Sequence, residues 1–361
     1  MPEPLKNLYS LELIASLCQE ISALYGEFDS HGFSQYVIDD RWQEKELKER
    51  MRHISESLHH FLPMKYAEAI QILINASAKF SGFEYMFFPG FVELYGLDKY
   101  EESIAALEHF TKYSSSEFAV RPFIKKYQGK MLKQMEIWAE SDNYHVRRLA
   151  SEGCRPRLPW AMSLPDFKKD PGQILPILAK LKNDESQYVR RSVANNLNDI
   201  SKDNPQVVIE IANNWLGDSP QVDWIVKHAA RTLLKKGEPA IMTLFGFIKP
   251  EHVNLETFHL QQSVEIGGEI SFSFRLRTQQ QQIGKLRIEY AIDFLKKNGR
   301  QSRKVFKVSE SVIRVQEKFV QKSHSFRKIS TRKYYAGSHR IAIIVNGYEL
   351  ANQEFLLTEV G

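Results

Sequence analysis

Residues 141–150 read SDNYHVRRLA and residues 183–194 read NDESQYVRRSVA, so one short pattern occurs twice in the chain. Each copy starts with acidic and amide side chains, continues with an aromatic residue and ends in a Val-Arg-Arg core, and the two valines are 43 residues apart. A weaker third copy, GDSPQVDWIVKHAARTL, occupies residues 217–233. The sequence therefore predicts a repeat architecture with a period near 40 residues.

The part of the chain up to about residue 247 has the apolar spacing of amphipathic helices. In LELIASLCQEISALYG (residues 11–26) and YAEAIQILINASAKF (residues 66–80), apolar side chains recur every three or four positions, and polar ones fill the opposite face. Helical repeats of about 40 residues are typical of HEAT-like proteins, in which helix pairs stack and the second helix of each pair lines a concave surface. We therefore predict a HEAT-like α-solenoid with a concave face over residues 1–250.

The hydrophobic period changes to two after about residue 255, which indicates strands. Apolar and polar residues alternate in EISFSFRLRT (residues 269–278) and KLRIEYAIDF (residues 285–294), as in strands with one buried face. Asn346-Gly347 stands between two apolar runs and predicts a tight hairpin, because both residues tolerate positive φ. These strands favour an immunoglobulin-like β-sandwich over residues 251–361, and Pro250 interrupts any helix at the junction.

The positive charge is concentrated in the C-terminal part. The chain of 361 residues has a formal net charge of +5, but residues 251–361 hold 18 Lys and Arg against 11 Asp and Glu. Residues 296–340 contain 14 basic side chains and only two acidic ones, Glu310 and Glu317. This asymmetry fits a polyanionic partner, most simply nucleic acid, although a basic face kept for solubility explains it equally well.

Composition argues against several classes of protein. Hydrophobic residues make up 43% of the chain, and no window approaches the length of about 18 apolar residues that a membrane span needs. The two cysteines, Cys18 and Cys154, are too few for a disulfide framework or a zinc cluster. The pair His59-His60 lacks matching ligands, so we expect no metal site and no cofactor. No export signal is evident, and we expect a cytoplasmic protein without membrane contact.

Helical spacing predicts a charged face on the second helix of each repeat. In residues 144–155, Arg148, Glu152 and Arg155 share one face, while an apolar stripe that starts at Val146 occupies another. The corresponding faces of the neighbouring segments carry further polar side chains: Arg191, Asn195 and Asp199 in the second copy, Lys227 or His228 with Arg231 in the third, and Glu117 with Arg121 in a preceding helix expected over residues 115–124. Stacked in order, these helices would form a basic trough that contains three carboxylates.

The residues alone leave two interpretations of this trough open. The arginines of Val-Arg-Arg can bridge adjacent repeats and pair with the acids, an arrangement that is common in helical solenoids. Alternatively, the cations contact a phosphate backbone, which carboxylates in the same trough would repel. A protein that must stabilise positive charge at the nucleic acid has a reason to place carboxylates there.

Several stretches of the sequence resemble one known family. SSEFAVRPF, VRRLASEGCRPRLPW and YVRRSVANNLNDISKDNP, at residues 115–123, 146–160 and 188–205, closely resemble the AlkC-type DNA alkylation repair glycosylases, relatives of the AlkD type. The resemblance extends to FVELYGLDKYEESIAALEHFT at residues 91–111 and covers nearly the whole chain. SEGCRPRLPW is its specific feature, because Val-Arg-Arg alone also occurs in generic HEAT proteins.

The resemblance implies a bacterial, monofunctional DNA glycosylase of base excision repair. Such an enzyme hydrolyses the N-glycosidic bond of small cationic alkylated bases in double-stranded DNA, chiefly N3-methyladenine, with N3-methylcytosine and N1-methyladenine as further substrates. The resemblance also implies that the enzyme kinks the duplex without flipping the base, unlike most glycosylases. The resemblance also implies that the Ig-like domain contributes to DNA binding. We expect a monomer that acts at the nucleoid.

Carried over position by position, the resemblance assigns the active site. The acidic positions of the family motif fall on Glu117, Glu152 and Asp199, the aromatic one falls on Trp160, and Arg155 also stands in its motif position. A cationic base is already a good leaving group, so the carboxylates would stabilise the oxocarbenium-like sugar and position water, with Glu152 as the leading candidate. Trp160 would stack on the lesion through a cation–π contact, or else anchor the loop as a core residue.

The remaining positions predicted to bind DNA are basic or amide side chains from both halves of the chain: Arg148, Arg191, Asn195, Lys227, Arg231, Arg303, Lys304, Arg332 and Lys333. Some of the arginines can instead bridge repeats, and strand alternation can turn half of the C-terminal side chains away from an interface. The alternative to an enzyme is a non-catalytic HEAT-repeat scaffold that binds DNA or an acidic protein.

Overall fold

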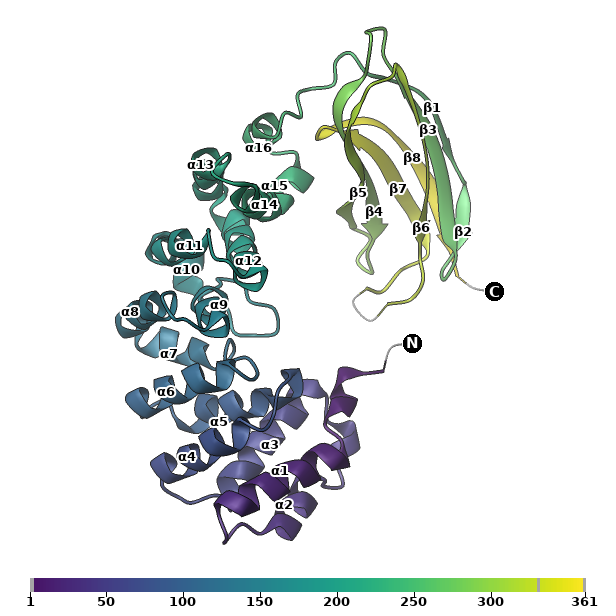
Figure 1. Ribbon diagram of the computed structural model, residues 1–361. Helices are drawn as coiled ribbons and strands as arrows, with labels where there is room; N and C mark the ends of the chain where they lie inside the picture. The colour runs from purple at the N-terminus through teal and green to yellow at the C-terminus, as the bar shows by residue number, and fades with distance from the viewer. Residues whose placement is uncertain (1–2, 330–331, 360–361) are drawn as a thin grey trace. The chain divides into compact units, whose positions relative to one another are not determined.

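Helices occupy the chain up to Leu244 and strands occupy it from Asn254 onward in the computed structural model, which describes residues 3–329 and 332–359 (Figure 1). The predicted fold class, helical repeats followed by an Ig-like β-sandwich, is therefore confirmed. The chain divides into a helical unit, residues 1–208 with 215–229, and a sandwich unit, residues 209–214 with 230–361. The predicted boundary at residue 250 lies in the segment between the last helix and the first strand, and a domain division at that point stays a prediction.

The helices are mostly short, and none in the described part of the chain combines the length and apolar character that crossing a membrane requires. The α-helices are α1 Leu11–Leu24, α2 Ser30–Val37, α3 Leu47–Phe61, α4 Tyr66–Ser77, α5 Phe87–Tyr95, α6 Tyr100–Thr111, α7 Val120–Lys126, α8 Gln128–Trp138, α9 Tyr144–Gly153, α10 Pro165–Lys169, α11 Leu175–Leu181, α12 Gln187–Asp203, α13 Pro205–Trp215, α14 Pro220–Ala229, α15 Arg231–Lys236 and α16 Pro239–Leu244. The 3₁₀ helices are η1 Leu5–Leu8, η2 Trp42–Glu44, η3 Phe83–Met86 and η4 Gly172–Ile174.

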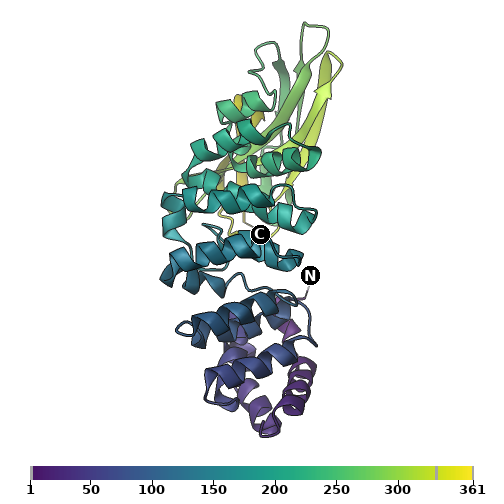
Figure 2. The same ribbon diagram turned by 60° about the vertical axis from the view of Figure 1, so that its left-hand side comes forward.

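The repeated sequence pattern corresponds to three helices that pack side by side. The copies form α9, α12 and α14, and α12 contacts both of the others (Figure 2). The equivalent valines, Val146, Val189 and Val222, are fully buried, as the apolar stripe predicts. Each repeat therefore buries its apolar face against the next one, which is how a helical solenoid builds a continuous core.

Helix α9 has sequence signals at both of its ends. The Asn143 side chain caps it by accepting a hydrogen bond from the backbone N–H of His145 at 2.9 Å. Near the other end, a Cβ added to Gly153 would lie 2.7 Å from Cγ2 of Val120, so only glycine allows α7 to approach this closely. Pro156 then helps to end the helix.

The helix predicted over residues 115–124 is shorter than expected. It begins as α7 at Val120, so Glu117 lies in the preceding turn rather than on a helix face. Pro122 has no N–H to donate. Because N–H groups in the first turn of a helix have no partner within the helix, proline is accepted there, and the helix starts close to Pro122. The helical spacing between Glu117 and Arg121 therefore does not apply.

The sandwich consists of a three-stranded sheet, in the order β1-β3-β6, and a five-stranded sheet, in the order β2-β8-β7-β4-β5. The strands are β1 Asn254–Leu260, β2 Ser263–Glu265, β3 Glu269–Arg277, β4 Gly284–Leu295, β5 Gln301–Ile313, β6 Glu317–Ser325, β7 Gly337–Val345 and β8 Tyr348–Thr358. Apolar side chains from both sheets, such as Phe272, Ile288 and Ile341, form one core.

The structure confirms the hairpin signal and corrects one strand prediction. Asn346 and Gly347, with φ of 48° and 83°, join β7 to β8 as a tight turn. β3 alternates buried and exposed residues as predicted, but β4 is buried on both faces. Its second face carries Ala291, which packs with apolar residues of the neighbouring strands, and the ion pair of Arg287 with Glu289. β4 is an inner strand whose two faces are both covered, so buried residues occur along both faces and not at alternate positions alone.

Candidate functional site

Three carboxylates and two arginines form a continuous chain of ion pairs in the helical unit. Arg148 donates from Nη1 to Oε2 of Glu117, and its Nη2 lies 3.5 Å from Oε1 of Glu152. Arg155 donates from Nη1 to Oε1 of Glu152 at 2.6 Å and from Nε to Oδ2 of Asp199 at 2.8 Å. We call these five residues the carboxylate cluster. Sequence reasoning named all five, and the structure brings them together.

The carboxylate cluster is largely buried. The exposed fraction of the side chain is 15% for Glu117, 6% for Glu152 and 1% for Asp199. Arg148 and Arg155 are exposed to 12% and 9%. Adjacent repeats pack closely enough for each arginine to reach the carboxylates on both sides, and charges at this depth need such partners.

Three residues that sequence reasoning missed complete the surroundings of the cluster. Ser192 donates from Oγ to Oε2 of Glu152 at 2.6 Å, and Lys202 donates from Nζ to Oδ1 of Asp199 at 2.9 Å. The Arg148 guanidinium lies 4.9 Å from the centre of the Tyr188 ring. Tyr188, Ser192 and Asp199 are four and seven positions apart on α12, so helical spacing contained the signal for them.

The pKa shifts in the cluster favour its charged form. Burial alone would raise the pKa of Glu152, but Arg148 and Arg155 outweigh burial and hold this pKa below its ordinary value. Burial alone would lower the pKa of each arginine, yet the neighbouring carboxylates raise it. Glu152 is therefore an ionised carboxylate at neutral pH, suited to stabilise a cation and unsuited to donate a proton.

Trp160 projects from the loop between α9 and α10. The residue is 61% exposed, so it is not the core residue that one interpretation of the sequence allowed. Its φ of 64° is uncommon for a residue other than glycine. The Trp160 carbonyl oxygen accepts a hydrogen bond from Lys48 Nζ at 2.6 Å, which ties the loop to α3. An exposed indole on a tethered loop can stack on a flat ligand.

Arg121 fastens both ends of this loop. Its guanidinium is fully buried and donates from Nη1 to the Gly153 carbonyl at 2.9 Å and from Nε to the Met162 carbonyl at 2.6 Å. Burial lowers the pKa of Arg121 to about 10, which leaves it charged at neutral pH. The residue was expected on the trough, but its contacts make it a support of the loop.

The neighbouring arginines of the first Val-Arg-Arg have different partners. Arg147 donates from Nε to Oδ2 of Asp184 at 2.6 Å and from Nη2 to Oε1 of Glu185 at 3.3 Å, so it bridges two repeats. Arg148 is bound to two carboxylates of the cluster. Both arginines therefore pair with acids, as the first interpretation of the trough has it, and contact of Arg148 with DNA stays a prediction.

The other positions of the helical part that were predicted to bind DNA are solvent-accessible to different degrees. Arg191 is exposed on α12, and Asn195, one turn later, lies with its Oδ1 3.2 Å from Nε2 of His228. Lys227 on α14 and Arg231, the first residue of α15, are half-buried. Their contact with DNA stays a prediction.

The predicted DNA-binding positions of the sandwich unit also remain accessible. Arg303 pairs with Asp293, with 2.9 Å between Nε and Oδ1, and is exposed to 38%. Lys304 and Lys333 are exposed, and the Arg332 guanidinium lies 4.5 Å from the centre of the Phe294 ring. These side chains present positive charge to solvent, as the charge asymmetry predicts.

A cavity of about 500 Å³ in the sandwich unit gathers several of these cations. Lys235 and Lys236 at the end of α15 line it together with Arg303 and Lys304 of β5. Burial, Arg332 and Lys235 lower the pKa of Lys304, because adjacent positive charges repel one another. Glu349 also lines the cavity and pairs with Arg303, and the remaining excess of cations suits a phosphate group.

The described residues, 3–329 and 332–359, contain no group of three or more His, Cys, Asp or Glu side chains that could hold a metal ion. His59 stacks on Tyr95 with 3.7 Å between ring centroids, and His60 stacks on Tyr36. Burial raises the pKa of the Cys154 thiol to about 12, so this cysteine is no nucleophile at neutral pH. The functional groups of the candidate site are carboxylates, arginines and an aromatic ring.

Two sequence families match separate parts of the chain. The family described as "DNA alkylation repair enzyme" matches residues 97–234, which include the whole carboxylate cluster. The family described as "Uncharacterised protein YhaZ, C-terminal Ig-like domain" matches residues 254–359.

Two individual proteins are similar over almost their full length. The uncharacterized protein YhaZ of Bacillus subtilis (strain 168) is 48% identical over 345 residues, which make up 95% of this chain and 96% of that protein. The structure of Pseudomonas fluorescens alkylpurine DNA glycosylase AlkC, bound to DNA containing an abasic site analog, superposes with a TM-score of 0.93. It is 36% identical, and the match covers 98% of this chain and 99% of that one.

Proposed function

The chain belongs to the DNA alkylation repair enzyme family, with an AlkC-like fold, and on this premise we propose that it is a monofunctional DNA glycosylase of base excision repair. Its substrates are small cationic alkylated bases in double-stranded DNA, chiefly N3-methyladenine, with N3-methylcytosine and N1-methyladenine as further ones. The observation that carries the proposal is the carboxylate cluster, three ion-paired acids from successive repeats, together with the exposed Trp160 on the loop after α9.

The proposed reaction is hydrolysis of the bond between C1′ of the sugar and the ring nitrogen of the base. A methylated base carries a positive charge, so it leaves with the electron pair of that bond and becomes neutral without a general acid. Positive charge then develops on the sugar, and a water molecule adds to C1′ and loses a proton. The reaction therefore requires fixed negative charge near the sugar and a group that orients the water molecule.

The three carboxylates divide these roles according to their accessibility. Both oxygens of Glu152 and of Asp199 already accept hydrogen bonds, so these residues contribute negative charge in a fixed position. Glu117 is the most exposed of the three, and among the residues that the structure describes only Ser115 and Arg148 contact its carboxylate, both at Oε2. We therefore assign contact with water to Glu117 and electrostatic stabilisation to Glu152, which spacing alone could not separate.

Trp160 is the residue proposed to meet the damaged base. Its indole is exposed on a loop whose backbone is fastened by Lys48 and Arg121. A cationic base is attracted to the face of an indole more strongly than a normal neutral base, which favours damaged over undamaged DNA. In this proposal the duplex is kinked so that the lesion reaches the loop without flipping into a pocket.

The basic side chains of both units are proposed to hold the phosphate backbone. Arg191, Asn195, Lys227 and Arg231 serve this role in the helical part, and Lys304 and its neighbours serve it in the sandwich. Each contact releases counterions from DNA, so binding weakens as salt rises. The protein acts on DNA as a monomer at the bacterial nucleoid, and it requires no metal ion.

The test is release of N3-methyladenine from methylated duplex DNA by the purified protein in the presence of EDTA. Metal-independent release is the expected result, because the cluster supplies all of the charge that the reaction needs. Binding of the same DNA without any release of base would support the alternative, a non-catalytic scaffold, and would refute the enzyme.

A further inference from the structure

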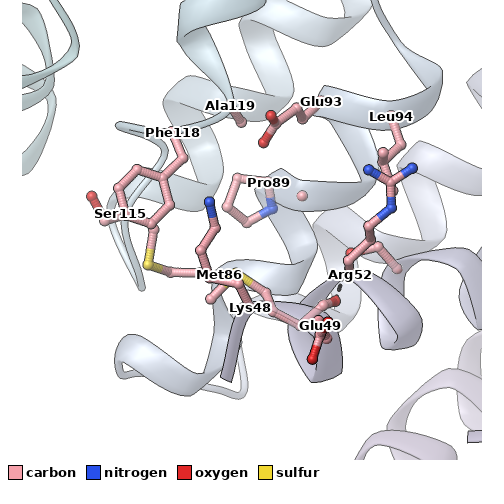
Figure 3. A pocket seen from close by; sticks show the side chains of 13 residues that line it. Lys48, Glu49, Arg52, Met86, Pro89, Glu93, Leu94, Ser115, Phe118 and Ala119 are labelled. Atoms are coloured by element: carbon pink, nitrogen blue, oxygen red, sulfur yellow. Dashed lines mark hydrogen bonds between the residues drawn. The ribbon is translucent and has the colours of Figure 1, made fainter. Parts of the chain in front are cut away.

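A cavity of about 240 Å³ lies in the helical unit between α3, α5 and the turn before α7 (Figure 3). Lys48 and Arg52, one turn apart on α3, line one side of it. Glu93 of α5 directs its carboxylate into the cavity, and Ser115 and Phe118 of the turn complete the lining. Lys48, Arg52 and Glu93 precede residue 97, where the match to the alkylation repair family begins.

Two residues that line this cavity contact the candidate active site. The Ser115 hydroxyl donates to Oε2 of Glu117 at 2.7 Å and accepts from Nη1 of Arg148 at 2.8 Å. Lys48 donates to the Trp160 carbonyl oxygen, and its ammonium lies 5.4 Å from the centre of the Phe118 ring. A small molecule released at the carboxylate cluster would therefore be close to the cavity.

Glu93 is an acceptor without a donor. Among the residues that the structure describes, none forms a hydrogen bond or an ion pair with its carboxylate, although the side chain is mostly buried. Burial raises the pKa of Glu93, and the nearby Lys48 and Arg52 only partly oppose this effect. Lys48 is engaged with Trp160, and Arg52 donates from Nε to Glu56 at 2.7 Å. A partly buried acceptor of this kind gains from a ligand that brings N–H groups.

The size and charge of the cavity select the class of ligand. Its formal charges balance, since Lys48 and Arg52 face Glu49 and Glu93. A water molecule occupies about 30 Å³ of the liquid, so the cavity holds the equivalent of about eight waters, which is room for a small molecule. The Phe118 ring offers a surface for a planar molecule. A neutral, flat heterocycle with an exocyclic amine meets all of these conditions.

We propose that this cavity binds the excised alkylated base, with Glu93 accepting a hydrogen bond from its exocyclic amine and Phe118 packing on its ring. This inference rests on the proposed function, because cleavage converts the cationic base into the neutral heterocycle that the cavity fits. It adds a site for the product beside the site of cleavage.

The test is calorimetric titration of the full-length protein with free N3-methyladenine, in the absence of DNA. Glu93→Met removes the acceptor and keeps the length of the side chain, and loss of an unpaired, partly buried carboxylate should not weaken the fold. Glu136→Met, on the exposed face of α8, is the matched control. We expect wild type and the control to bind the base equally, and Glu93→Met to bind it about ten-fold or more weakly, the effect of one hydrogen bond to a charged group. Phe118→Leu should also weaken binding.

Two outcomes would overturn the inference: wild-type protein that does not bind the free base, or a Glu93→Met variant that binds it as well as wild type does. Excision from methylated DNA is measured separately and decides the proposed function. Excision without binding of the base therefore refutes the product site alone. Binding that depends on Glu93, in a protein that excises nothing, refutes the glycosylase and leaves a heterocycle site.

Discussion

Lys48 and Trp160 are joined by a hydrogen bond of 2.6 Å between Nζ and the carbonyl oxygen, although the residues are 112 positions apart. Trp160 has a φ of 64°, and a left-handed conformation costs a residue with a side chain about 1–2 kcal/mol. The lysine stabilises this conformation, which leaves the indole 61% exposed. The N-terminal helices thus contribute directly to the arrangement of the candidate active site.

Lys48→Met should lower the single-turnover rate of excision by about ten-fold, because the loop loses the hydrogen bond from Lys48 that helps to position the Trp160 indole. Lys48→Arg keeps a donor and should restore part of the rate. Acrylamide quenching of Trp160 fluorescence reports whether the loop has moved. The Trp160 signal is obtained by subtracting the fluorescence of the matching protein with Trp160→Phe. A normal rate in Lys48→Met, with altered quenching, would show that the position of the loop does not limit excision.

Glu152→Gln should reduce excision by about 10²-fold or more, since the amide keeps hydrogen-bonding groups but removes the negative charge that opposes the sugar cation. The affinity for DNA that contains an abasic-site analogue should change little. Single-turnover excision and equilibrium binding provide the two measurements. Glu136→Gln, an equal change of charge on exposed α8, is the control. An equal loss of excision and of binding would assign Glu152 a structural role.

The lowered pKa of Glu152 predicts how stability responds to acid. Because the folded-state pKa lies below the ordinary value of 4.5, the stabilisation is fully present above about pH 4.5 and is lost as pH falls through the folded-state value. The unfolding temperature of the helical unit should therefore fall less steeply with acid in Glu152→Gln than in wild type. Calorimetric scans between about pH 3.5 and 6 measure both slopes. Parallel curves would show that Glu152 is not stabilised as an anion by folding.

The sequence predicted the repeat, the strands, the hairpin and the five residues of the cluster, but it could not separate neighbouring side chains with equal chemistry. Arg147 and Arg148 are adjacent in the same motif, yet one bridges repeats through Asp184 and the other binds Glu117. Because the two arginines are adjacent on the helix, their side chains point in different directions, and the partner of each comes from a different repeat. Only the packing of the repeats determines those partners.

Long-range contacts account for the other differences between the sequence predictions and the structure. Nothing near Lys48 indicates that it reaches Trp160, because no local spacing links α3 to the loop after α9. Likewise, the periodicity around Glu117 suggested a helix that begins only at Val120. Periodicity reports which residues share a face of one element, whereas the site is assembled from α3, the turn before α7, α9 with the loop that follows it, and α12.

Arg147→Gln should destabilise the helical unit without impairing excision, in contrast to changes in the cluster. Asp184 is exposed to only 4% and would lose its main cationic partner, at a cost of about 3 kcal/mol. Chemical denaturation followed by circular dichroism measures this loss, and excision is assayed well below the unfolding temperature. A large loss of excision in the folded variant would mean that Arg147 also contacts DNA.

The sandwich unit should contribute to the salt dependence of DNA binding. Lys304 and Lys333 are exposed and present positive charge beside Arg332. The logarithm of the binding constant falls linearly with the logarithm of salt concentration, by about 0.9 for each phosphate contact. Lys304→Gln with Lys333→Gln should therefore weaken binding and make the slope shallower by nearly two units, as measured by fluorescence anisotropy at several salt concentrations. Lys133→Gln, at an exposed position on α8, should leave the slope unchanged. An unaltered slope in the double variant would mean that these lysines belong to a basic face that only interacts with solvent.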